Sequence, residues 1–237
     1  AFGRALQLLQ SDPGQSPMRQ AWPLTGIGMA RIGLGRFEAA QQALEQALAL
    51  AQSMLDENHA LISNIRGAEA RILAYRGDYT GAERLFAAAA AVYERSPQYQ
   101  TSRVGWYRGL ALLAADRNEE AVGVLTIAVE HATQLTSAVG PDVLNARAAL
   151  ALAQARLGDP VAAEPQVRAT LAGLAELGLE NSIQHALAAL HLAEILRLRG
   201  ETSESARWHQ QAEAQMVRLL GNDHPRVASL RAGVSPP

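Results

Sequence analysis

One short phrase recurs along this chain and constrains its fold more than any other feature. A helical segment ends at a turn position, usually a glycine, and small residues follow five and twelve positions later. The two clearest copies are Gly35 with Ala40 and Ala47, and Gly77 with Ala82 and Ala89. The five turn positions are residues 35, 77, 116, 158 and 200, which are 42, 39, 42 and 42 residues apart. So regular a period indicates a repeat protein.

Each position in the phrase has a physical role in a pair of packed helices. Glycine adopts the positive φ that ends one helix and turns the chain into the next. Seven positions before each turn stands another small residue: Gly28, Ala70, Gly109, Ala151 and Ala193. Small residues on both helices allow a close approach, and larger residues such as Leu44, Phe86 and Leu125 fill the gaps. Each copy therefore predicts a hairpin of two helices.

These residues resemble the tetratricopeptide repeat, a helix–turn–helix unit with an aromatic and alanine pattern. The 42-residue spacing is similar to the kinesin-light-chain-like subclass, as is the junction Gly221-Asn222-Asp223-His224-Pro225. The sequence Gly140-Pro141-Asp142 occupies the matching junction earlier in the chain. The resemblance covers about residues 20–232 and implies an all-α, right-handed superhelical solenoid that binds proteins or peptides.

The breaker residues and the repeat frame together predict the element boundaries. We expect a single solenoid domain over residues 1–237, with no second domain inside it. Its parts are a leading helix at 1–16, hairpins at 20–54, 59–96, 98–136, 141–178 and 180–220, a capping helix at 222–232 and a tail at 233–237. The capping helix is expected to cover the apolar face that the fifth hairpin would otherwise expose.

The composition excludes several classes of function. All 21 basic residues are arginine, so the lysines of P-loops, kinases and Schiff-base enzymes are missing. There is no cysteine for a disulfide or a thiolate metal site. A net charge of −2 disfavours a general nucleic-acid surface, and the charge-free apolar runs are too short to span a membrane.

The remaining candidates for chemistry have simpler explanations. The glycine-rich stretch from Gly26 to Gly35 lacks the preceding strand and the acidic ribose partner of a nucleotide site, and the repeat frame explains it. The six histidines include no i, i+4 pair, so no metal site is predicted, and only His191 is retained as a groove residue. We therefore predict no catalytic residue, no metal and no cofactor.

The resemblance places the binding surface on the first helix of each hairpin, which lines a concave groove. A helical wheel selects the groove residues Trp22, Met29, Asn64, Arg71, Tyr75, Arg103, Trp106, Leu110, Asn145, Arg156, Glu194 and Arg197. The same wheel adds Thr25, Ile32, Leu113, Leu152, Leu187 and Leu190. Tryptophan, tyrosine and arginine are enriched at binding hot spots, and the four arginines predict a partner segment with acidic and apolar residues. The alternative is that Trp22, Trp106 and several leucines pack between hairpins.

The sequence thus predicts a non-enzymatic protein- or peptide-binding scaffold or regulatory module. Its resemblance to the C-terminal repeat regions of bacterial multidomain signalling proteins implies that it is part of a larger protein. The alternative is a domain of a kinase or transcriptional regulator that senses a ligand or a signal peptide, and self-association is a third hypothesis. A cytoplasmic location is the first expectation, and an extracytoplasmic one follows if a membrane span precedes the chain in its parent protein.

Overall fold

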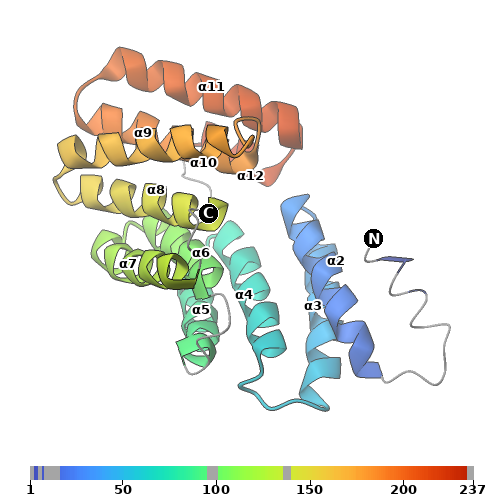
Figure 1. Cartoon of the computed structure of the whole chain (residues 1–237). Coiled ribbons are helices and arrows are strands. Elements are labelled where there is room, and N and C mark those ends of the chain that lie inside the picture. The colour runs from blue at the N-terminus through green and yellow to red at the C-terminus, as the bar shows by residue number, and fades with distance from the viewer. Residues whose placement is uncertain (1–2, 5–6, 8–16, 95–100, 136–139, 234–237) are drawn as a thin grey trace. The chain divides into compact units, whose positions relative to one another are not determined.

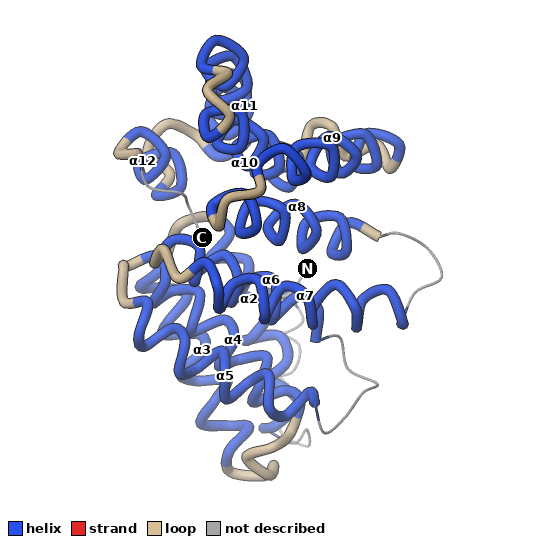
Figure 2. Tube along the Cα trace, turned by 90° about the vertical axis from the view of Figure 1, so that its left-hand side faces the viewer, coloured by secondary structure: helices blue, strands red, loops and turns tan. Residues whose placement is uncertain are grey.

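The fold is that of a computed structural model, which describes residues 3–4, 7, 17–94, 101–135 and 140–233. Throughout these residues the chain forms helices joined by loops (Figures 1 and 2), so the expected all-α fold of stacked helical repeats is confirmed. The helices gather into two compact units, Ala1–Tyr99 and Gln100–Pro237. No helix in the described ranges is both long and apolar enough to cross a membrane.

The first unit contains the first two repeats. Its elements are η1 (Pro17–Gln20), α2 (Ala21–Gly33), α3 (Phe37–Gln52), α4 (Ala60–Tyr75) and α5 (Tyr79–Glu94). Helix α2 packs against α3 and α4, and α4 packs against α5 (Figure 1). Leu44, Ile62 and Ile65 are fully buried at the centre of this unit. The predicted leading helix at 1–16 lies almost entirely outside the described residues.

The second unit contains the remaining repeats. Its elements are α6 (Thr101–Ala114), α7 (Asn118–Leu135), α8 (Pro141–Arg156), α9 (Pro160–Glu176), α10 (Ile183–Leu198), α11 (Thr202–Leu220) and α12 (Pro225–Arg231). The first helices α6, α8 and α10 pack in series, and each also packs against the second helix of its own hairpin (Figure 1). The short α12 packs against α11, and its Val227 and Leu230 join the core that contains Trp106.

The backbone explains why the five turn positions recur. The φ angle is positive at Gly35, Gly77, Asp116, Gly158 and Gly200, which are the five positions that the repeat identified. The non-glycine case, Asp116, has a φ of 57°, a conformation that aspartate tolerates better than most residues. The period of the sequence is therefore a period of the backbone conformation.

The small residues before the turns allow the two helices of a hairpin to approach closely. A Cβ atom added to Gly28 would lie 2.6 Å from the Cγ atom of Leu44. A Cβ atom added to Gly109 would collide with Leu125 in the same way. Leu44 and Leu125 occupy the same position, nine residues after their turns. The repeat phrase thus encodes a knob-and-hole contact between helices.

Candidate binding site

A concave pocket of about 820 Å³ lies in the second unit. Its walls come from the end of α6 and the α6–α7 turn, the end of α8, most of α10, the start of α11, and α12 with Gly233 after it. The lining residues are Leu113, Ala114, Asp116, Asn118, Arg156, Leu187, Leu190, His191, Ala193, Glu194, Arg197, Leu198, Ser205, His209, Leu230 and Gly233. This volume is within the range of ligand pockets in proteins.

Arg156 on α8 connects three successive repeats in the pocket wall. Its Nε and Nη2 atoms donate to the two carboxylate oxygens of Glu194 on α10, at 2.8 and 3.0 Å. Its Nη1 atom donates to the carbonyl oxygen of Leu113 at 2.7 Å, and lies 3.5 Å from Oδ1 of Asn118. The Arg156 and Glu194 side chains are 15% and 20% exposed. A bidentate ion pair that is shielded from water in this way fixes the position of α8 relative to α10.

Two other charged side chains in the pocket, Arg197 and Asp116, form no ion pair with any residue that the structure describes. Arg197 lies one helical turn after Glu194 and is exposed, and no carboxylate within the described ranges forms an ion pair with it. Asp116 is exposed at the α6–α7 turn, where it accepts a hydrogen bond from Nδ2 of Asn118 at 2.9 Å. Both charges therefore face solvent or a bound partner.

His191 lies in the same wall and is only 8% exposed. Burial lowers the pKa of this imidazole from 6.5 to about 4, although nearby Glu194 opposes the shift. Its Nδ1 atom has no hydrogen-bond partner among the described residues. At neutral pH His191 is thus an uncharged, amphipathic part of the wall.

Leucines supply the apolar part of the pocket. Leu187 and Leu230 are buried, whereas Leu190 is partly exposed. The hydroxyl of Ser205 donates to the carbonyl oxygen of Ala193 at 2.6 Å, which joins α11 to α10. Within the described ranges, no group of histidine, aspartate and glutamate side chains is arranged to hold a metal ion. The pocket can offer apolar contact, hydrogen bonds and separated charges.

Seven of the predicted groove residues line this pocket, and others are buried. The seven are Leu113, Arg156, Leu187, Leu190, His191, Glu194 and Arg197. Trp106, Leu110 and Asn145 are instead 5%, 3% and 3% exposed. Trp106 belongs to the core of the second unit, with its ring against that of Tyr107. Burial of Trp106 and Leu110 is what the packing alternative expects, and Asn145, which that alternative did not include, is buried as well.

The predicted groove residues of the first unit lie on α2 and α4. Trp22 and Met29, seven residues apart on α2, are 51% and 40% exposed. On α4, Asn64, Arg71 and Tyr75 are partly buried, and the Tyr75 ring stacks on Phe37 at 4.9 Å. Their role in binding stays a prediction.

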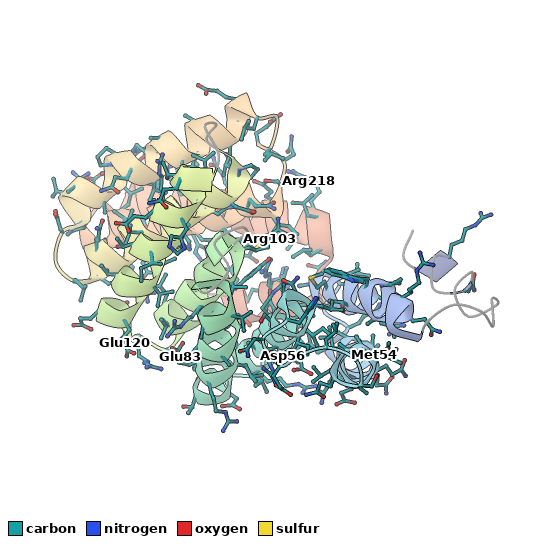
Figure 3. The ribbon with its side chains drawn as sticks, turned by 60° about the horizontal axis from the view of Figure 1, so that its bottom comes forward. Met54, Asp56, Glu83, Arg103, Glu120 and Arg218 are labelled. Atoms are coloured by element: carbon teal, nitrogen blue, oxygen red, sulfur yellow. The ribbon has the colours of Figure 1, made fainter. Side chains whose placement is uncertain are left out.

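Ion pairing changes the expected electrostatics of the second unit. The Arg103 side chain, labelled in Figure 3, is exposed, but its Nη2 atom lies 3.0 Å from a carboxylate oxygen of Asp142. Arg156 is paired with Glu194. Of the predicted groove arginines in this unit, Arg197 alone keeps an uncompensated charge. The expected row of open positive charges is therefore absent from the described part of the second unit.

Sequence reasoning did not identify Asp116, Asn118 or Leu230 as site residues. A signal for the charged contacts was nevertheless present. Four ion pairs that link neighbouring repeats join residues 36–39 positions apart: Arg76 with Glu38, Arg103 with Asp142, Arg156 with Glu194, and Arg168 with Glu204. This separation equals the repeat period minus the length of about one helical turn. A search for opposite charges at that spacing would have found the Arg156–Glu194 pair.

Comparison with known proteins supports the repeat assignment. Two family models, both described as tetratricopeptide repeat, match residues 19–95 and 185–226, which together are half of the chain. No curated protein sequence matches the chain.

Solved structures of repeat proteins share the fold. A Podospora anserina protein described as a kinesin light chain with nearly identical TPR-like repeats has a TM-score of 0.61 at 19% identity, and the match covers 86% of this chain and 97% of that one. BtubC from P. vanneervenii has a TM-score of 0.66 at 16% identity over 93% and 88% of the two chains. A Rap protein complexed with Competence and Sporulation Factor has a TM-score of 0.70 at 17% identity, over 97% of this chain and 61% of that one.

Proposed function

Because the chain belongs to the tetratricopeptide-repeat superfamily, we propose that it is a non-enzymatic protein- or peptide-binding module whose second unit holds part of the partner in the α6–α12 pocket. The observation that carries the proposal is the pocket itself. It is lined by the first helices α8 and α10, and it combines leucines with unpaired charges. The parent protein is a larger bacterial signalling protein in this proposal, a context that rests on the resemblance of the 42-residue repeats.

The chemistry of the pocket supports recognition of a short segment rather than a flat protein surface. Partly exposed Leu190 offers apolar contact for one side chain, and buried His191 beside it is uncharged. The Arg156–Glu194 pair is already satisfied, so a partner gains little by competing for either group. Affinity would come from apolar contact at the leucines, with charges at the two ends of the pocket setting orientation.

A selection experiment tests this function. A displayed library of random peptides is panned on the full chain, and binders are measured against two variants of the second unit. Leu190→Asp places a charge in the pocket and is expected to weaken binding at least tenfold. Leu177→Asp makes the same change at an exposed leucine outside the pocket, and is expected to leave binding unchanged. Binders that ignore Leu190→Asp would show that the pocket is not the site.

The second candidate is a regulatory domain that senses a small ligand or a signal peptide. The volume of about 820 Å³ favours it, because drug-sized molecules bind in pockets of this size. The Rap structure, which holds Competence and Sporulation Factor, is a complex on a similar fold. A thermal-shift screen of metabolites and short peptides distinguishes the candidates. A metabolite that raises Tm in the native chain but not in Leu190→Asp would support the sensing function.

A further inference from the structure

We propose that the pocket of the second unit selects a peptide segment with opposite charges at its two ends, basic toward the α6–α7 turn and acidic toward the end of α10. This inference rests on the proposed function. It replaces the segment of acidic and apolar residues that the four predicted groove arginines indicated.

The charged side chains of the pocket wall follow a fixed order. The acidic and arginine side chains in the wall are Asp116, Arg156, Glu194 and Arg197. Asp116 lies beside Asn118, and Arg156 reaches both Asn118 and Glu194. Arg197 follows Glu194 by one turn of α10. The row therefore alternates as negative, positive, negative, positive across three successive repeats.

The two inner residues of this row, Arg156 and Glu194, differ from the two outer residues in whether an ion pair neutralises their charge. Arg156 and Glu194 bind one another through two hydrogen bonds and are largely shielded from water. Asp116 and Arg197 are exposed, and each lacks an ion-pair partner within the described part of the chain. The charges of these four groups sum to zero. The wall nevertheless has an exposed negative charge at one end, Asp116, and an exposed positive charge at the other, Arg197.

A segment along this wall experiences a fixed polarity. A cationic group is attracted to Asp116 in the third repeat, and an anionic group to Arg197 in the fifth. A segment in the reverse orientation meets repulsion at both ends, and a segment with two like charges meets it at one end. The charges therefore select both composition and direction, while apolar contact at Leu190 is the same in either direction.

The residue types permit conservative tests at both ends. Asp116 has a φ of 57°, and asparagine is among the residues that tolerate this conformation, so Asp116→Asn removes the charge without forcing the turn to change. Arg197 is in the last turn of α10, where a cation also stabilises the helix end. Thermal unfolding of Arg197→Gln therefore accompanies its binding measurement.

The experiment uses acetylated, amidated octapeptides with Ala, Leu, Asn and Ser randomised inside and Arg, Glu or Gln at each end. On the full chain, peptides with one Arg end and one Glu end are expected to be enriched about twofold to tenfold over peptides with two Gln ends, the range for two exposed ion pairs. One order of Arg and Glu should exceed the other. Asp116→Asn should abolish the preference for Arg alone, and Arg197→Gln the preference for Glu alone. The control Arg207→Gln removes an exposed arginine of α11 outside the pocket and should change neither.

The outcomes separate this inference from the proposed function. Binding that Leu190→Asp abolishes, but that is indifferent to the end charges, would overturn the charge selection and leave the proposed function standing. Enrichment of peptides with two Glu ends would overturn the charge selection and favour the acidic and apolar segment that the sequence predicted. Binding that is insensitive to Leu190→Asp would overturn the proposed function, and this inference with it.

Discussion

His191 is an imidazole held in an environment that favours its neutral form. Burial lowers its pKa to about 4, whereas the unfolded chain binds the proton near 6.5. Between these values the unfolded state takes up more protons than the folded state. Stability from this group is therefore complete above pH 6.5, falls as the pH decreases toward 4, and levels off below it.

We expect the free energy of unfolding of the native chain to decrease by about 2–3 kcal/mol through this window because of His191. The His191→Leu variant should lose this part of the pH dependence. In His209→Leu, which replaces an exposed histidine of the same pocket, the decrease should persist. Urea unfolding monitored by circular dichroism from pH 7.5 to 4 measures all three proteins. Parallel curves for the native chain and His191→Leu would show that this histidine is not the source.

At the scale of helices, the hairpin contact depends on small residues at fixed positions after the turn. Ala82, five residues after Gly77, is fully buried in α5, whereas Ala88 on the same helix is exposed. We expect Ala82→Leu to destabilise the first unit by about 1–3 kcal/mol, because three extra carbons must enter a close helix contact. Ala88→Leu should change stability by no more than about half a kcal/mol. Chemical denaturation measures both, and equal losses would mean that the assigned hairpin contact is wrong.

At this scale the sequence predicted the turns between helices but not the contacts of the side chains. The turns inside the hairpins could be predicted because each has a positive-φ residue at a spacing of 39 or 42 residues, which is a glycine in four copies; Asp116 was located by its position in the repeat alone. The orientation of Trp106 could not be predicted, because a shift of one or two positions on a helical wheel turns a groove residue into a core residue. Pairing of Arg156 with Glu194 was likewise missed, because charge was counted residue by residue rather than between repeats. A periodic backbone feature can thus be predicted from the sequence of one repeat, whereas a binding site depends on contacts between repeats.

At the scale of the whole molecule, the buried apolar side chains of the described residues form two cores, one in each unit. The core of the second unit runs from Trp106 on α6 through Leu152 and Leu192 to Leu230 on α12. A separate core around Leu44 stabilises the first unit. In stacked repeats each helix contacts mainly its neighbours, so a terminal helix contributes to stability by covering the last apolar face. Val227 and Leu230 of α12 are buried in the core of the second unit, as this role requires.

We therefore expect Leu230→Ala to destabilise the second unit by about 2–4 kcal/mol, the range for removing a buried leucine side chain. Native-state hydrogen exchange is the informative measurement, because it reports the opening free energy of each helix. Amides of α8 and α10 should lose protection in this variant together with those of α11, since one continuous core joins them. Amides of α3 and α4, which belong to the other core, serve as the internal reference. Leu219→Ala, at an exposed leucine near the end of α11, is the matched control and should leave protection unchanged. If Leu230→Ala lowers protection in α11 alone, α12 stabilises only the last hairpin and does not cap the core of the second unit.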